Sequence, residues 1–336
     1  MAENSNIEWC DHTFNPWIGC TKVSPACDNC YAASFGNRFG IEWGSGKPRK
    51  RTSESNWNQP LRWNRQAELK QNAWEKFKGR HPGLTDEQLI ERGFIKPVRP
   101  RMFCASLADV FDNEVPSDWR ADLFDLIGST PHLDWLLLTK RIGNAQKMLN
   151  EYFPSGWGNW VDRYPNIWLG ATICNQEEAD RDIPKLLKTP AAVRFLSIEP
   201  LLGQIDLNMS LGGTRWIGGQ RGCNGKTNGE HHHDERCGRG IDWVIVGGES
   251  GKDARPMHSE WVRSLRDQCA EAGVPFFFKQ WGEWIQRHDL QASNSECVGK
   301  LWHTFDPDSS VCRIGKKTAG RFLDGVEYSE YPMSES

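Results

Sequence analysis

The sequence predicts an α/β fold in which parallel strands form a full or partial (βα) barrel with inserted loops. Seven short apolar runs recur along the chain, helical patterns separate most of them, and polar side chains follow nearly every run. Runs that are apolar throughout are typical of strands buried on both faces, and strands that alternate with helices usually pair in parallel.

The predicted elements follow one another in a regular order. The seven predicted strands cover residues 14–19, 101–106, 134–139, 167–172, 193–198, 242–247 and 275–279. The predicted helices cover 117–129, 141–153, 175–189 and 258–273. In the last helix, Ser259 is the predicted N-cap and Gly273 the predicted stop.

The barrel is favoured over an open sheet because polar residues follow almost all the strands. These residues are Ser106, Asp109, Lys140, Arg141, Thr172, Asn175, Glu199, Glu249, Ser250, Lys279 and Gln280. The carboxyl ends of barrel strands converge on one mouth, where active sites are built. An open doubly wound sheet, the alternative fold, gathers only the strand ends beside its switch point.

Three segments lie outside this alternation. Residues 36–100 form a basic, Trp-bearing insertion, and residues 203–241 form an insertion rich in Gly, His and Cys. Residues 282–336 show no clear periodicity. We therefore expect a barrel over residues 1–281, followed by an irregular C-terminal extension.

Composition places the chain among cytoplasmic proteins. Of its 336 residues, 38% are hydrophobic and 25% are charged, and no run of 18 apolar residues predicts a membrane span. The first residues lack the basic and apolar regions of an export signal. Eleven cysteines, an odd number and partly grouped, indicate metal ligands in a reducing compartment better than disulfides.

Three cysteines, Cys20, Cys27 and Cys30, lie directly after the first predicted strand. Structural zinc sites and closed iron–sulfur clusters take four protein ligands, so three thiols indicate a distant fourth ligand or a metal with an open position. Cys10 is the candidate fourth ligand, although a strand-like run separates it from Cys20, which favours a buried thiol. Three thiolates can also hold a [4Fe–4S] cluster whose fourth iron is open.

Cysteines in the loop after the first barrel strand make this chain resemble the radical S-adenosylmethionine (SAM) enzymes. The usual motif of those enzymes is CxxxCxxC, whereas here six residues separate the first two cysteines, and Asn29 stands where an aromatic residue is usual. The stretches CDHTFNPWIGCTKVSPACDNCYA, LLLTKR, WLGATICN, FLSIEPLLG, DWVIVGGESG and PFFFKQWGEW resemble a phage- and bacteria-borne family of radical-SAM-like proteins of unknown function.

The resemblance implies a mechanism and partners. A cluster held by Cys20, Cys27 and Cys30 would cleave SAM to a 5′-deoxyadenosyl radical, which abstracts a hydrogen atom from the substrate. An electron-donor protein such as flavodoxin or ferredoxin is expected. Some family members are encoded beside a three-Cys-motif partner protein, which is a second implied partner.

The resemblance also implies roles for the polar strand ends. Ser106 and Asp109 occupy positions comparable to those that hold the methionyl amino group. The implied cofactor contacts are completed by Tyr31, Thr172 and Asn175, and the candidate catalytic residues are Glu199, Lys140 and Glu249. Helix capping is an equally good interpretation of Ser106, Asp109, Thr172 and Asn175.

A second metal site is predicted in the Gly-rich insertion. Cys223, His231, His232, His233 and Cys237 lie in a segment with too few apolar residues to order itself by burial, so a metal would help to fold it. Imidazole and thiolate ligands together favour Zn²⁺. A solvated polar loop is the alternative.

A nucleic acid or another nucleobase-containing molecule, modified or repaired by the enzyme, is the predicted substrate. Residues 47–101 carry 14 Lys and Arg against 6 Asp and Glu, a balance of +8 in a chain of net charge −3. The candidate contacts are Lys47, Arg49, Lys50, Arg51, Trp57 and Trp63, because cations seek phosphates and aromatic rings stack on bases. The alternative is that the cations are solvated and the tryptophans anchor this segment to the barrel.

Other functions stay open on the sequence alone. A zinc-dependent nucleic-acid-binding protein without radical chemistry would also explain the thiols, the histidines and the basic segment. A radical SAM enzyme that acts on a peptide or a small metabolite is the other alternative. A hydrolase or transferase has little support, because no GxSxG, P-loop or HExxH motif occurs.

Overall fold

The computed structural model describes residues 3–153, 161–208, 216–217, 240–289 and 297–332, and within them the chain builds a seven-stranded parallel sheet. The strand order is β1-β4-β5-β6-β7-β8-β9. The strands are β1 (His12–Thr13), β4 (Arg101–Cys104), β5 (Asp134–Thr139), β6 (Ile167–Thr172), β7 (Val193–Ile198), β8 (Trp243–Gly247) and β9 (Phe276–Gln280). Because the spatial order follows the chain, there is no switch point, and the sheet curls into a half-barrel. The predicted partial barrel is therefore confirmed, and the doubly wound alternative is wrong.

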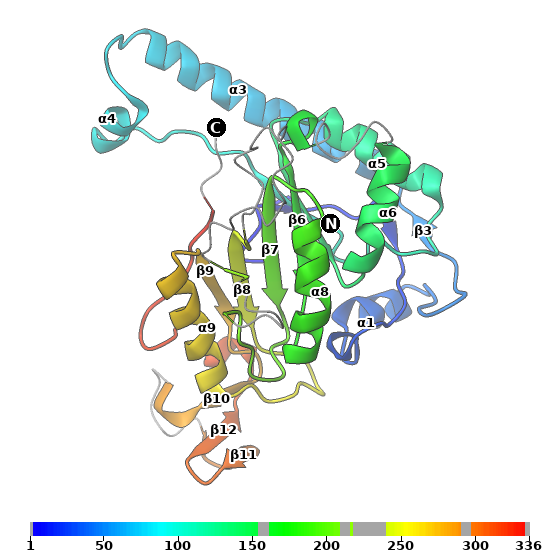
Figure 1. The fold of residues 1–336 in the computed structure, drawn as a ribbon, viewed down its shortest axis with the longest axis vertical. Coiled ribbons are helices and arrows are strands. Elements are labelled where there is room, and N and C mark those ends of the chain that lie inside the picture. The colour runs from blue at the N-terminus through cyan, green and yellow to red at the C-terminus, as the bar shows by residue number, and fades with distance from the viewer. Residues whose placement is uncertain (1–2, 154–160, 209–215, 218–239, 290–296, 333–336) are drawn as a thin grey trace, which may run out of the picture.

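Helices cover the convex face of the sheet (Figure 1). They are α5 (Ser117–Gly128), α6 (Ile142–Tyr152), α8 (Gln176–Lys188) and α9 (Ser259–Ala272), within one residue of the predicted spans at most ends. Gly273 ends α9 in the left-handed conformation, as predicted. The predicted cap Ser259 is wrong by one residue, because the His258 side chain accepts the Glu260 N–H.

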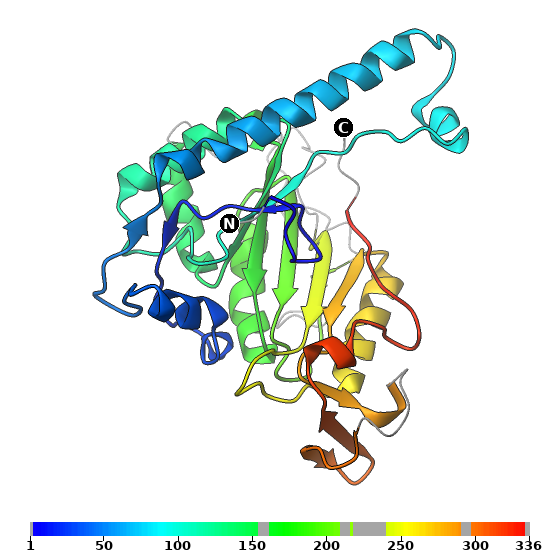
Figure 2. The same cartoon turned by 180° about the vertical axis from the view of Figure 1, so that it is seen from behind.

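The concave face has a core of its own. Phe103, Phe195 and Trp243 alternate along their strands with the residues that face the helices, and Trp9 and Cys10 of the N-terminal segment pack against them. Figure 2 shows this segment crossing the face that the helices leave open. The N-terminal segment thus closes the amino half of the half-barrel.

The first predicted strand, residues 14–19, is corrected by the structure. His12–Thr13 joins the large sheet, whereas β2 (Trp17–Ile18) pairs with β3 (Lys50–Arg51) in a separate two-stranded ribbon. Pro16 has no N–H to donate to a ladder. Asn15 bonds instead through its side chain, which accepts the N–H of Leu107 at 2.7 Å.

Helices that the sequence pattern did not indicate follow the last cysteine of the cluster. They are α1 (Tyr31–Arg38), which begins before the basic insertion, and α2 (Glu54–Trp57), α3 (Gln59–Gly79) and α4 (Asp86–Glu91) within it. α3 crosses the amino edge of the sheet, where Asn64 accepts the His132 N–H just before β5, and its second half extends beyond the body of the molecule (Figure 1).

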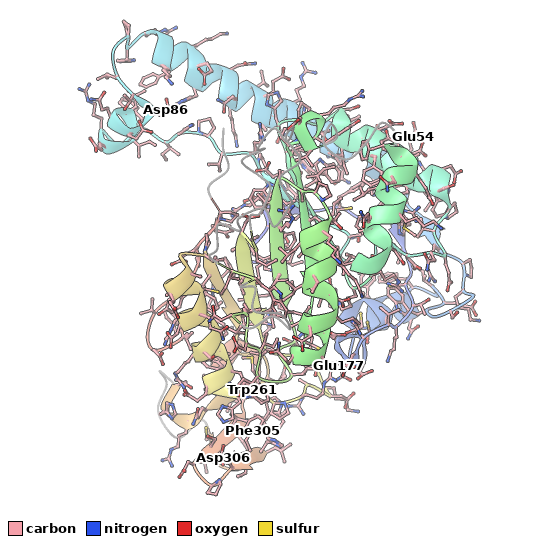
Figure 3. All side chains as sticks on the ribbon, viewed as in Figure 1. Glu54, Asp86, Glu177, Trp261, Phe305 and Asp306 are labelled. Atoms are coloured by element: carbon pink, nitrogen blue, oxygen red, sulfur yellow. The ribbon has the colours of Figure 1, made fainter. Side chains whose placement is uncertain are left out.

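The C-terminal extension, predicted to be irregular, contains a small antiparallel sheet in the order β10-β12-β11. Its strands are β10 (Trp284–Gln286), β11 (Trp302–Asp306) and β12 (Ser309–Arg313). All three are short and β11 is largely exposed, so the alternation of apolar and polar residues that would predict strands is weak. Short helices, η2 (Arg287–Asp289) and α10 (Lys316–Ala319), accompany them. Figure 3 shows Phe305 near Trp261 of α9, with the ring centroids 5.4 Å apart. None of the helices in the described ranges is long and apolar enough to span a membrane.

Candidate functional site

The three predicted ligand cysteines share one loop, residues 19–30, which we call the cysteine loop. It follows β2 and ends at α1, with the short 3₁₀ helix η1 (Pro25–Cys27) inside it. Cys27 is buried, and Cys20 and Cys30 are half-buried. Gly19 begins the loop with φ +115° and donates its N–H to the Leu107 carbonyl, which ties the loop to the segment that follows β4.

Arg141, directly after β5, reaches the first cysteine. Its Nη1 lies 3.3 Å from Cys20 Sγ, and its Nη2 donates to the Thr21 carbonyl at 2.6 Å. Burial raises the pKa of the Cys20 thiol to about 11, and Asp109 adds to this rise while Arg141 opposes it. A metal that replaces the thiol proton would offset this cost of burying a thiolate.

Asp109 holds Arg141 and the turn after β5. One carboxylate oxygen accepts from Thr139 Oγ1 at 2.7 Å and from the Phe111 N–H at 2.9 Å. The other accepts from the Lys140 N–H at 3.0 Å and from Arg141 Nη1 at 3.2 Å. Because all four bonds stay within the protein, the geometry favours a positioning role for Asp109 over the cofactor contact that the resemblance implied.

Arg49 lies behind the cysteine loop and not on the surface. Its guanidinium lies 2.7 Å from Asp112 and 3.1 Å from Glu114, and it donates to Thr21 Oγ1 at 2.8 Å. No part of the Arg49 side chain is exposed. The role predicted for Arg49 as a nucleic-acid contact is therefore corrected: it supports the loop from inside.

Arg255 clamps the second half of the cysteine loop to the end of β8. It bonds Glu249 through two nitrogens, Nε at 2.9 Å and Nη2 at 2.7 Å, and it also reaches Asp28 at 3.2 Å and the Pro25 carbonyl at 2.9 Å. Asn29 adds a bond to Glu249 at 3.1 Å. Although burial opposes it, these bonds hold the pKa of Glu249 below its usual value. Glu249 is thus an anchor for the Cys27–Cys30 turn.

Polar groups gather at the carboxyl half of the concave face. Glu199 lies 2.9 Å from Lys279, and Ser197 Oγ donates to Glu199 at 3.2 Å. Burial lowers the pKa of Lys279, but Glu199 outweighs burial and raises it overall. A side chain at Gly247 would place its Cβ 2.7 Å from Glu199 Oε1, so any larger residue there would require the carboxylate to shift. Thr172, on the neighbouring strand, is buried, and its Oγ1 has no partner within the described residues.

The other residues implied as cofactor contacts are engaged within the protein. Tyr31 donates its hydroxyl to the Ser106 carbonyl at 2.8 Å, and Ser106 Oγ accepts from Asn15 at 2.9 Å. Asn175 caps α8 by accepting the Glu178 N–H at 2.9 Å. For Asn175, the capping interpretation fits the geometry.

Lys140 lines a shallow cavity of about 290 Å³ between the cysteine loop, α6 and α8. Val23 of the loop, Arg181 and Lys185 also line it. The last two are paired with Asp182, at 2.6 Å and 2.9 Å. The cavity borders the cysteine loop and carries an excess of positive charge.

The predicted nucleic-acid contacts are spread over different environments. Lys47 pairs with an acidic residue five positions earlier, and Lys50 is exposed. Arg51 lies over the Trp57 ring, 4.2 Å from its centroid, and Trp57 is partly buried against the core. Trp63 is only 2% exposed and stacks on a histidine of β1, so a base-stacking role for Trp63 is corrected to an anchoring role.

Among the described residues, no group of three or more His, Cys, Asp or Glu side chains is placed to hold a single metal ion. A [4Fe–4S] cluster is a different case, because each thiolate binds a different iron and the sulfurs therefore lie further apart. Three thiols on one anchored loop fit such a cluster in donor type and number. The predicted zinc ligands Cys223, His231, His232, His233 and Cys237 lie outside the described residues.

The sequence did not single out Arg255, it marked Asn29 only as a departure from the usual motif, and it left Arg141 as a residue of the strand end. A weak signal for Arg255 exists, since a cation six residues after the buried-strand carboxylate Glu249 is a plausible partner. Nothing in the local pattern indicates that Arg141 reaches Cys20, 121 positions away.

Comparison with known proteins identifies a family but no activity. A family model described as a protein of unknown function, DUF5131, matches residues 4–332. No curated protein and no solved structure matches the chain.

Proposed function

This chain belongs to the DUF5131 family of proteins of unknown function, and we propose that it is a radical SAM enzyme that holds a [4Fe–4S] cluster. One observation carries the proposal: Cys20, Cys27 and Cys30 lie on a single loop beside the carboxyl edge of a curled parallel sheet, and the sheet anchors both halves of that loop. An open iron next to strand ends rich in polar groups is the arrangement that SAM chemistry requires.

The chain's own residues would prepare the thiols for the cluster. Arg141 donates an N–H toward Cys20 Sγ and so favours its thiolate form. Arg255 and Asn29 fix the turn that carries Cys27 and Cys30. Hydrogen bonds to ligating sulfurs also tune iron–sulfur reduction potentials, so Arg141 would make the cluster easier to reduce.

The concave face would bind the polar groups of SAM. Thr172 Oγ1 has no hydrogen-bond partner in the part of the chain that the structure describes, and Glu199 is held at the same end of the sheet by Lys279. A hydroxyl and a carboxylate suit the ribose and amino groups of SAM. The chemistry that the cluster supplies when bound is one-electron cleavage of SAM to methionine and a 5′-deoxyadenosyl radical.

Anaerobic reconstitution with iron and sulfide tests the proposal. The protein should bind about four iron atoms per chain and release 5′-deoxyadenosine when it is reduced with SAM present. Cys20→Ala, Cys27→Ala and Cys30→Ala should each reduce 5′-deoxyadenosine to the level without enzyme.

Cys10→Ala is the matched control, and it should keep both iron and product. Cys10 packs in the concave core, and its thiol contacts Ser5 Oγ at 3.4 Å and the Ile7 carbonyl at 3.7 Å, so its partners are in the N-terminal segment and not in the cysteine loop. Stoichiometric zinc with negligible iron would contradict the proposal and favour the zinc-dependent alternative.

A further inference from the structure

The outer face of α3 and its C-cap carry five cationic side chains that we call the basic ridge. They are Arg62, Arg65, Lys70 and Lys76 of α3 and Arg80, the residue directly after it, and all are exposed. At 3.6 residues per turn they fall within about 140° of the helix circumference. The two buried tryptophans of α3, Trp63 and Trp74, lie about 100° around the helix from the centre of the ridge. The ridge side chains themselves are all exposed, so the ridge faces solvent.

No ion pair of the described residues includes a ridge cation, whereas several cations of other helices are paired. Arg181 and Lys185 of α8 both pair with Asp182, and Arg263 of α9 pairs with Asp324. On α3 itself, Lys78 faces away from the ridge and pairs at 2.8 Å with Asp86 of α4, labelled in Figure 3. The ridge therefore gathers five cations of the basic insertion that no ion pair among the described residues includes.

An uncompensated ridge is unfavourable for an isolated helix. Arg62 and Arg65 are three residues apart, and Lys76 and Arg80 are four apart, which are the spacings at which like charges repel on a helix. A polyanion bound along the ridge would remove that repulsion. The whole chain has a net charge of −3, so the positive charge is concentrated here and does not reflect a generally basic protein.

The ridge fits a duplex better than a single strand. Single-strand binders stack bases on exposed aromatic rings. Here Trp63 and Trp74 are buried, and Phe77 is packed against His81 and Phe94. From Arg62 to Arg80 the helix rises about 27 Å, which matches about eight base-pair steps of a duplex.

We propose that the basic ridge of α3 binds the phosphate backbone of a double-stranded nucleic acid. α3 crosses the amino edge of the sheet, away from the cysteine loop (Figures 1 and 2). The inference goes beyond the proposed function, because this binding requires neither the cluster nor SAM.

Fluorescence anisotropy of labelled 20-base-pair DNA and RNA duplexes with the full chain, over a series of salt concentrations, tests the ridge. Five phosphate contacts predict a slope of log K against log salt of about −4.5 for B-DNA. Lys76→Gln with Arg80→Gln should weaken binding at low salt by at least about tenfold and bring the slope to about −2.7. Gln is a good helix former and these sites are exposed, so thermal unfolding should be unchanged.

Lys316→Gln with Lys317→Gln, which removes the same charge from the exposed surface of α10, is the matched control and should leave binding unchanged. Equal weakening by the control pair, or no binding of either duplex at low salt, would overturn the proposal. Tighter binding of a poly-glutamate chain than of a duplex would also overturn it and indicate an acidic protein partner.

Discussion

Arg141 is the residue on which the geometry of the cysteine loop depends most. Its guanidinium contacts the Cys20 sulfur, the Thr21 carbonyl and the buried carboxylates Asp109 and Asp112. Only 8% of the Arg141 side chain is exposed, and the two carboxylates are similarly buried. Removing the cation would leave buried negative charge without its partner.

Arg141→Met should therefore lower the free energy of unfolding by about 3–5 kcal/mol, the usual cost of breaking a buried ion pair from one side. Urea unfolding of the protein without metal measures this. Adding Asp109→Asn should recover part of the loss, because it removes the unpaired charge. Asp112 keeps Arg49, 2.7 Å away, and is not expected to contribute much. A loss below about 1 kcal/mol would show that the network carries little energy.

At the scale of single residues, the sequence predicted the cysteines of the loop better than it predicted the residues that support the loop. Clustered thiols are visible in a sequence because the residue type is rare and the spacing is short. The supports are ordinary Arg, Asp and Asn residues whose partners are distant in sequence: Arg141 and Asp109 are 32 positions apart, and Asn29 and Glu249 are 220 apart. Only folding brings these charges together, so no local pattern records them.

Among the elements, β5 begins with a buried acid. Asp134 is 2% exposed, and its nearest cation is Arg99, with Nη1 3.7 Å away. Burial raises the pKa of Asp134 to about 7, and Arg99 opposes the rise. The folded state therefore holds the proton more tightly than the unfolded chain does.

The sign of the pH dependence follows from that difference. The contribution of Asp134 to stability is fully present below about pH 4 and is lost as pH rises to about 7. Asp134→Asn should remove this decline and stabilise the protein at pH 8 by up to about 4 kcal/mol. Urea unfolding at pH 5 and pH 8 measures it, and parallel profiles for variant and parent would contradict the assignment.

The strands could be predicted from the sequence where both of their faces are buried. β5, β6 and β7 match the predicted spans because each is an uninterrupted apolar run. The sequence did not predict α3, because only three of its 21 residues are buried and the helix therefore has almost no apolar stripe.

For the whole molecule, the N-terminal segment takes the place of the wall that a closed barrel would have. Trp9 is 1% exposed, and its ring centroid lies 4.6 Å from that of Phe103 and 6.4 Å from that of Trp243. Trp9→Ala should lower the free energy of unfolding by about 3–5 kcal/mol, because the cavity opens into the concave core. Trp302→Ala is the control: that side chain is 42% exposed on β11 and should cost little. Equal effects in urea unfolding would contradict the role of the segment.

The sequence predicted the α/β class and the convergence of strand ends, but it did not decide whether the barrel is full or partial. Closure depends on strand number and tilt, and seven strands with only two residues in β1 leave the sheet open. The open side is filled by Trp9 and Tyr331, from opposite ends of the chain, which no periodicity connects.

Electron paramagnetic resonance of the reduced, reconstituted protein tests the central claim most directly. The account predicts a [4Fe–4S] signal that changes when SAM is added, because three cysteines leave one iron open to the amino and carboxylate groups of SAM. The Cys10→Ala variant should show the same change. A signal that SAM leaves unaltered, or the absence of any iron–sulfur signal, would contradict the account.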